Sequence, residues 1–318
     1  MLLNENHDRL RELLESSSVE TREVAWAKIY AADTVEEAGK LAGYFMLHHL
    51  LSHWEELILW CFARAPSQVA AWHTIAQWWP NEWRGHNILL APFDEIRGSQ
   101  YLKLENDEFR SRLPRGFLPN ALLLKPGDCS QKYLEQHVAT LNADIKPWVR
   151  EDVFSIALAG TSPNASLEEI QAPGYDPSKY EFHLAFDRPG LAFQQQAYKA
   201  IPMSVPASTQ QQREQVVDSA DSLASDHVVT MSAWFLGTQT EAMVLAIPDN
   251  RGINLWRMLN EPPSTEVPGT LIQQHAGMER DTDDFGIGYL VACTTKASLR
   301  EYDAAKSHYE KTGRILGV

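Results

Sequence analysis

The sequence of 318 residues is poor in cysteine and lacks any long apolar stretch. Its three cysteines, Cys61, Cys129 and Cys293, are far apart and form no CxxC pair. We therefore expect neither a disulfide framework nor a structural zinc site, and a reducing, cytoplasmic location. Charged residues interrupt the apolar stretches well short of the roughly 20 residues that a membrane span needs. Residues 1–11 carry mixed charge without the apolar core of a signal peptide.

The chain also lacks the short motifs that identify common enzyme sites. Neither G-x-S-x-G nor GxxxxGK occurs. Residues 286–288, Gly-Ile-Gly, have no third glycine and precede an expected strand, which excludes a dinucleotide fingerprint. Residues 160–162, Gly-Thr-Ser, follow an expected strand, but Pro163 after them favours an ordinary turn. No family and no cofactor is indicated.

Basic residues are outnumbered, and the excess of acid is uneven. The net charge is −14, and residues 151–318, with 22 acidic and 12 basic residues, account for −10 of it. Glu214–Asp284 alone has 12 acidic and 3 basic residues, a net of −9. Such charge repels nucleic-acid phosphates and anionic lipid, so neither nucleic acid nor a membrane is an expected partner. It would attract a basic protein; alternatively it only keeps the chain soluble.

The first part of the chain is rich in tryptophan and has helical patterns. Seven of the ten tryptophans lie between Trp26 and Trp83. We expect helices over residues 19–32 and Val35–Ala63, the second opened by a Thr34–Glu37 capping box. Another helix is expected between Pro66 and Pro80. The sequence thus predicts a helical, tryptophan-rich domain over 1–118.

Residues 119–318 alternate between strand and helix patterns, which predicts an α+β fold: an N-terminal helical bundle followed by a mixed β-sheet with packed helices. Gly237–Thr240 joins two strand patterns and is typical of a hairpin. The expected strands are 121–125, 153–159, 180–187, 228–236, 241–247 and 289–294, and the expected helices are 128–145, 253–259 and 298–313.

Two sets of residues have the chemistry of an active or metal site. His49 and His53 project from one face of the long expected helix and could ligate a divalent metal, but imidazoles in such an apolar segment more often pack in the core. We therefore expect no metal site. Glu181, His183 and Asp187 share one face of an alternating strand, where carboxylates would orient an imidazole for acid–base work. The same alternation is found in any half-exposed strand.

Two further sets suit the binding of a partner. Glu279, Asp281, Asp283 and Asp284 place several carboxylates in one loop, without the spacing of an EF-hand. They form either a solvated loop or a contact surface for a basic protein. Trp79 and Trp83 are core residues if buried and interface anchors if exposed.

Composition and motifs together favour a non-enzymatic, acidic protein-binding protein. An inhibitor or bacterial immunity-type protein that neutralises a basic partner such as a toxin domain fits the charge, because opposed charge speeds encounter. The alternatives are an enzyme of unknown, hydrolase-like class that uses a His/carboxylate site, and a helical scaffold subunit whose tryptophans dock another protein.

Overall fold

The computed structural model describes most of the chain as strands and helices that alternate in sequence. The mixed α/β class expected from the sequence is confirmed. The residues described are 2–15, 18–24, 26–63, 66–96, 111–117, 119–122, 131–150, 152–161, 198–202, 227–231, 235–236, 239–264, 267–275 and 290–316.

The larger of two sheets has eight strands in the order β1-β2-β11-β10-β7-β3-β4-β6. Neighbouring strands from β2 to β6 are parallel, and β1 pairs with β2 antiparallel at one edge. β7, β10 and β11 are buried along their whole length, as expected of parallel strands covered on both faces. The strands are β1 (Glu20–Val24), β2 (Ala27–Ala32), β3 (Leu57–Phe62), β4 (Ile88–Pro92), β6 (Asn120–Ala121), β7 (Val153–Ala159), β10 (Ala242–Ala246) and β11 (Leu290–Thr295).

A small antiparallel sheet, β5-β9-β8, is attached where β4 ends. Phe93 makes the connection: its N–H donates to the Phe62 carbonyl at 2.7 Å, and its carbonyl accepts from the Met231 N–H at 2.5 Å. The strands are β5 (Asp94–Ile96), β8 (Tyr198–Pro202) and β9 (His227–Met231). The small sheet therefore lies at the carboxyl end of the parallel strands.

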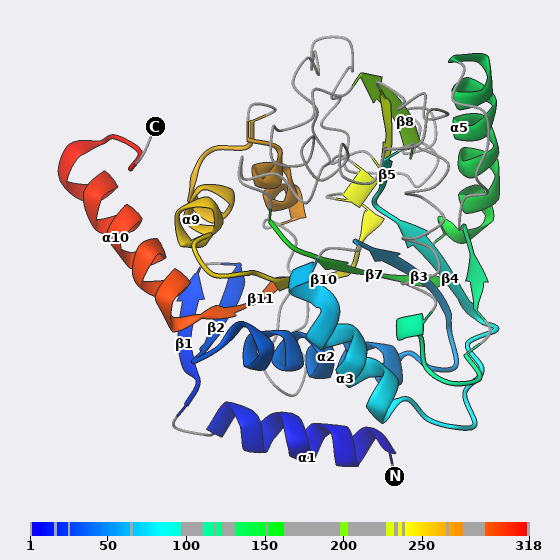
Figure 1. The fold of residues 1–318 in the computed structure, drawn as a ribbon, viewed down its shortest axis with the longest axis horizontal. Helices are drawn as coiled ribbons and strands as arrows, with labels where there is room; N and C mark the ends of the chain where they lie inside the picture. The colour runs from blue at the N-terminus through cyan, green and yellow to red at the C-terminus, as the bar shows by residue number, and fades with distance from the viewer. Residues whose placement is uncertain are drawn as a thin grey trace, which may run out of the picture.

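Helices cover both faces of the large sheet, with α1, α2 and α3 below it and α5, α9 and α10 above it in Figure 1. Among the residues that the structure describes, no helix is long and apolar enough to span a bilayer. The helices are α1 (Leu2–Glu15), α2 (Val35–Ser52), α3 (Val69–Trp78), α5 (Gln131–Ile145), α9 (Gly252–Asn260) and α10 (Lys296–Thr312), with 3₁₀ turns η1 (Pro66–Gln68), η2 (Lys146–Trp148) and η4 (Pro268–His275).

Two apolar cores lie on the two sides of this sheet, because successive strand residues point to opposite faces. In β3, Trp60 and Phe62 belong to the core under α2 and α3, whereas Leu59 and Cys61 belong to the core under α9 and α10. The Trp60 ring stacks on Trp72 of α3 with centroids 4.8 Å apart. Trp60, Trp72, Trp79 and Trp83 thus belong to one of the two cores, whereas Trp54 is exposed.

Two helices expected in the N-terminal part are wrong. β1 and β2 lie within the range 19–32, and the helix expected over Val35–Ala63 ends at Ser52 and is followed by β3. A fully buried parallel strand is a continuous apolar run, which periodicity alone does not separate from a buried helix. Strands from both sides of residue 118 enter the same sheet. Whether 1–118 and 119–318 fold as separate units stays a prediction.

Several other element predictions are confirmed, but the hairpin is wrong. The Thr34–Glu37 capping box forms, since each side chain accepts a hydrogen bond from the other residue's N–H. β7, α5 and α9 lie where they were expected. β10 pairs in parallel with β7 and β11, whereas β9 belongs to the small sheet. The chain between β9 and β10 therefore joins the small sheet to the large one instead of forming a hairpin.

Candidate functional site

The topology of the large sheet marks one position along its carboxyl edge. β3 and β7 are neighbours, but the chain moves from β3 to β4 on one side and from β7 to β10 on the other. In open α/β sheets, ligands bind outside the carboxyl ends of the strands where the connections diverge in this way. The candidate site therefore lies beyond Ala63 and Gly160, which follow β3 and β7.

The start of α3 lies at this position. Pro66 opens the 3₁₀ turn η1 that leads into α3, and its fixed φ suits the first turn of a helix. Gln68 is completely buried, and Thr161 beyond β7 is nearly so. The first N–H groups of a helix have no intrahelical partner and form the positive end of its dipole. This arrangement suits an anionic group of a ligand.

Two glycines of α2 allow α3 to reach this place. A Cβ atom added at Gly43 would lie 2.6 Å from the Thr74 Cβ and 2.8 Å from the Ala71 carbonyl oxygen. A Cβ at Gly39 would lie 2.7 Å from the Ala70 Cβ. The close packing of the two helices thus depends on the absence of side chains at these positions.

The substitution Gly43→Val is expected to lower the free energy of unfolding by about 1–3 kcal/mol, since the added atoms overpack a tight contact. The change is measured as a shift of the urea midpoint. Lys40→Val, on an exposed turn of the same helix, should change the free energy by less than about 1 kcal/mol, because it removes an exposed pair with Glu36. Equal effects of the two valines would contradict this account.

The loop after β10 brings a cation to the same edge, one strand away from β7. The Arg251 Nη1 donates to the Asn250 carbonyl at 3.1 Å and to the Asn250 Oδ1 at 2.8 Å. Asn250 has a φ of 57°, a left-handed conformation that asparagine tolerates. The Arg251 Nε is buried and has no hydrogen-bond partner in the part of the chain that the structure describes. In the described ranges no carboxylate forms an ion pair with this guanidinium.

Other charges near this loop are already neutralised or engaged. The Lys296 Nζ lies 2.8 Å from the Asp33 Oδ1, at the ends of β11 and β2. The Asp249 carboxylate accepts a hydrogen bond from the Thr295 hydroxyl, and the Glu301 carboxylate accepts from the Gly252 N–H at 3.0 Å. Among the described residues near this loop, Arg251 is thus a cation without a carboxylate partner.

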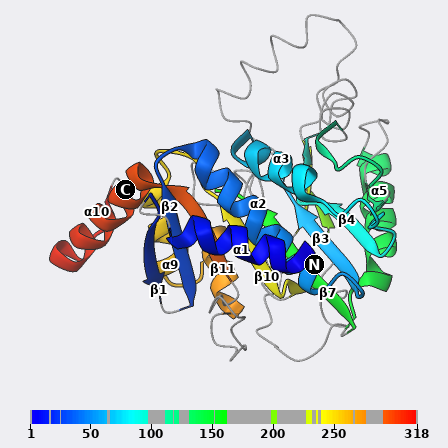
Figure 2. The same cartoon turned by 90° about the horizontal axis from the view of Figure 1, so that it is seen from below.

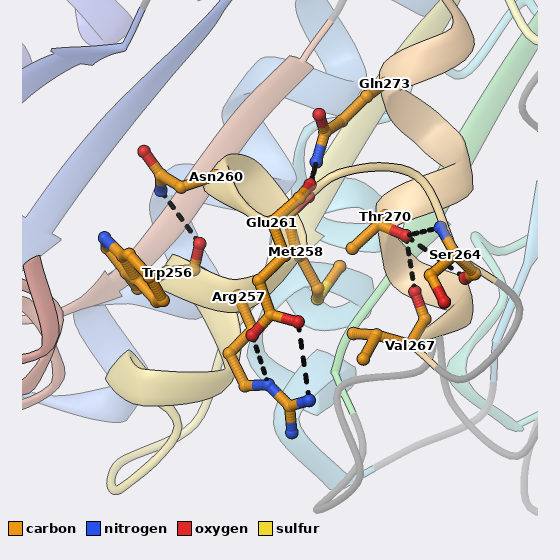
Figure 3. Close-up of polar contacts among 9 residues, drawn as sticks. All are labelled: Trp256, Arg257, Met258, Asn260, Glu261, Ser264, Val267, Thr270 and Gln273. Atoms are coloured by element: carbon orange, nitrogen blue, oxygen red, sulfur yellow. Dashed lines mark hydrogen bonds and ion pairs between the residues drawn. The ribbon is translucent and has the colours of Figure 1, made fainter. Parts of the chain in front are cut away.

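α9, which begins directly after Arg251, is held at both ends. At its start, a Cβ on Gly252 would collide with the Ser298 carbonyl oxygen, so the helix touches the backbone of α10. At its end, the Gln273 Nε2 donates to the Met258 carbonyl at 2.7 Å and to the Glu261 carbonyl at 2.8 Å (Figure 3). These contacts fix the position of α9 against α10 and η4.

An ion pair and a threonine complete this support (Figure 3). The Arg257 Nε lies 2.6 Å from the Glu261 Oε1, with only 19% and 12% of the two side chains exposed. The Thr270 hydroxyl donates to the Val267 carbonyl at 2.7 Å and accepts from the Ser264 N–H at 2.7 Å. The ion pair thus braces the end of α9, and the threonine joins η4 to the loop that precedes it.

The ion pair makes a prediction about stability. Arg257→Met is expected to cost about 1–3 kcal/mol of unfolding free energy, because it leaves the poorly solvated Glu261 carboxylate without its partner. The double variant Arg257→Met/Glu261→Met should recover most of the loss, since no buried charge remains. Urea unfolding of the three proteins tests this, and a double variant less stable than the single one would refute it.

The structure describes only some of the residues that the sequence predicted as functional. Trp79 and Trp83 are 7% and 8% exposed and stack with centroids 4.5 Å apart. The Trp79 Nε1 donates to the Trp83 carbonyl and the Trp83 Nε1 to the Asn87 Oδ1. They are core residues, so the interpretation of these two as interface anchors is not supported. Outside the described residues lie Glu181, His183, Asp187, Glu279, Asp281, Asp283 and Asp284.

His49 and His53 lie near Phe154, away from the carboxyl edge. The His53 ring stacks on Phe154 with centroids 3.6 Å apart, and its Nδ1 lies 3.0 Å from the Glu56 Oε1. Within the described ranges no group of three or more His, Cys, Asp or Glu side chains is arranged to hold a metal ion. Sequence reasoning missed Arg251, although a polar run after an apolar strand and before a helix was a signal for it.

No protein-family profile and no curated protein sequence matches this chain. Solved structures do. A 6-phosphogluconolactonase from Plasmodium vivax has a TM-score of 0.62 at 11% identity, over 93% of this chain and 99% of that one. The chain has the fold of this lactonase. A monomeric glucosamine-6-phosphate deaminase of the NagB superfamily matches with a TM-score of 0.57 at 13% identity, over 86% and 98% of the chains. The Trypanosoma brucei 6-phosphogluconolactonase matches at 0.56 and 9%, over 86% and 97%.

This likeness corrects the main functional hypothesis. The matched proteins are a lactonase and a deaminase, that is, enzymes, which contradicts the hypothesis of a non-enzymatic inhibitor or immunity-type protein. That hypothesis rested on net charge and on the lack of a recognisable catalytic set. Net charge governs solubility and encounter rates but carries no information about the fold. The enzyme alternative is the better supported of the two. A basic protein partner stays an untested prediction.

Proposed function

We propose that the protein is an enzyme that acts on a phosphorylated sugar, with a sugar-phosphate lactone as the first substrate to test. The observation that carries the proposal is Arg251, a cation to which the described residues offer no carboxylate partner, at the carboxyl edge of a sheet whose fold is that of two sugar-phosphate enzymes. Proteins of this fold differ in chemistry, so the fold supplies an expectation and the site residues supply the argument.

Arg251 and the start of α3 suit the phosphate of such a substrate. A guanidinium binds phosphate through two parallel N–H donors. Arg251 donates hydrogen bonds to Asn250 through Nη1, and no described residue accepts one from its Nη2. β10 is separated from β3 by β7, and neighbouring strands lie about 4.8 Å apart. Arg251 and the first turn of α3 both follow strands of this sheet at their carboxyl ends.

The chemistry requires a base. In lactone hydrolysis a water oxygen bonds to the carbonyl carbon, the bond from that carbon to the ring oxygen breaks, and the ring oxygen takes up a proton. His183, flanked in sequence by Glu181 and Asp187, belongs to the connection between β7 and β8 that leaves the carboxyl edge. We assign it the removal of the proton from water, because imidazole is suited to this near neutral pH.

A turnover assay tests the proposal. The purified protein is incubated with 6-phosphogluconolactone in weak buffer, and acid release is compared with spontaneous hydrolysis. Ammonia release from glucosamine 6-phosphate is followed in parallel. We expect acceleration of the first reaction and a much weaker effect on the unphosphorylated gluconolactone. Absence of turnover with both phosphorylated substrates would refute the proposal.

A cytoplasmic location belongs to the same proposal. Cys61 and Cys293 are free thiols buried in the two cores. Burial raises the pKa of both thiols above its ordinary value, so they are inert in the native state. Free buried thiols fit a reducing compartment.

A further inference from the structure

The loop that carries Arg251 is fastened to the start of α10. This helix follows β11 and lies beside α9 in both views (Figures 1 and 2). The Ser298 hydroxyl donates to the Pro248 carbonyl at 3.0 Å and accepts from the Arg251 N–H at 3.4 Å. The hydroxyl of Thr295, the N-cap of α10, donates to the Asp249 carboxylate. The chain on both sides of position 250 is therefore held by side chains of another element.

Asn250 lies between these fastened residues in a conformation that few side chains tolerate. Its φ of 57° is in the left-handed region, where asparagine is enriched. Among the described residues it is the only one other than glycine with a positive φ. Such a conformation persists only where the surrounding structure holds it, and it is often found at functional sites. The hydrogen bonds of Ser298 and Thr295 supply this support on both sides of Asn250.

Both acceptors of Asn250 meet one nitrogen of the Arg251 guanidinium. The Arg251 Nη1 donates to the Asn250 carbonyl at 3.1 Å and to its Oδ1 at 2.8 Å. Two bonds to one neighbour restrict a long side chain that would otherwise sample many rotamers. The Oδ1 belongs to an amide without net charge, so it orients the cation without neutralising it. An aspartate at this position would hold the guanidinium and cancel its charge.

We infer that Asn250 is a positioning residue that fixes the Arg251 guanidinium for a phosphate ligand and leaves its charge in place. This inference rests on the proposed function, in which Arg251 binds the phosphate of the substrate. Asn250 acts through Arg251, and its own contact is with the guanidinium alone. A side chain that is ordered before the ligand arrives loses less freedom on binding, so the effect of Asn250 falls on the affinity for phosphate.

Calorimetric binding of inorganic phosphate to the full-length protein tests the inference. Asn250→Gly keeps the left-handed backbone and removes the side-chain acceptor, so we expect the Kd to rise about 2- to 10-fold. Asn250→Asp keeps the shape and adds a charge that pairs with Arg251 and repels phosphate, so we expect a rise of about 10- to 100-fold. A role in the backbone alone would leave the Kd unchanged in both variants, because glycine and aspartate both tolerate this conformation.

The control is Asn81→Asp, which adds the same charge at an exposed position between α3 and β4 and should keep the wild-type Kd. Urea unfolding shows that each variant is folded, and if Asn250→Asp is not, Asn250→Gly decides. Wild-type Kd values in the Asn250 variants, with weakened binding in Arg251→Ala, would overturn the inference and leave the proposed phosphate site standing. If the wild type binds no phosphate, or Arg251→Ala binds it equally well, the proposed site is wrong and the inference falls with it.

Discussion

Arg251→Ala is expected to reduce kcat/KM for a sugar-phosphate substrate by about 10- to 150-fold, mainly through a higher KM. A hydrogen bond to a charged group contributes about 1.5–3 kcal/mol, and each 1.4 kcal/mol corresponds to a factor of ten. The loss should fall on KM because the phosphate is bound equally in the ground and transition states. Steady-state kinetics with 6-phosphogluconolactone provide the measurement.

Matched variants separate charge from geometry. Arg251→Lys keeps the charge but loses the planar fork, so its kcat/KM should lie between those of the wild type and the alanine variant. Arg300→Ala removes an exposed arginine of α10 and should leave both constants unchanged. If Arg251→Ala behaves like Arg300→Ala while the wild type turns over the lactone, the phosphate is bound elsewhere and our assignment of Arg251 is wrong.

His183→Ala is expected to reduce kcat by about 10²- to 10⁴-fold, the usual contribution of a general base. KM should change little, because the base acts on water and not on the phosphate. Single-turnover and steady-state rates at saturating lactone measure the effect. His308→Ala in α10 serves as the control for loss of an imidazole and should retain full activity.

Glu181 and Asp187 refine this prediction. If a carboxylate orients the imidazole, Asp187→Asn or Glu181→Gln should lower kcat by less than His183→Ala does, because the base itself remains. An active His183→Ala variant would show that the catalytic base is another residue. It would leave the phosphate assignment untouched, since Arg251 belongs to a separate loop.

Local patterns of the sequence predicted elements that short-range physics controls. The Thr34–Glu37 capping box, the Pro66 helix start and the Gly313 C-cap with a φ of 64° all depend on residues within one turn of each other. β7, an apolar run buried throughout, was also found from its sequence alone. The α/β class followed from the alternation of such elements.

The partner of each strand was decided by tertiary structure. LILWCF in β3 is apolar throughout and matches a buried helix as well as a buried strand. β9 and β10 resemble a hairpin in sequence, yet β10 pairs with β7 and β11, which are far away in the chain. Pairing of this kind depends on burial of both faces, which no local window reports.

Tertiary structure also decided which residues lie at the candidate site. Composition determined the net charge of −14, the scarcity of cysteine and the absence of common motifs. The placement of Arg251 at the sheet edge where β3, β7 and β10 end required folding, because these elements are separated by many positions along the chain. A side chain gains its chemistry from neighbours that only the packed sheet and its helices bring together.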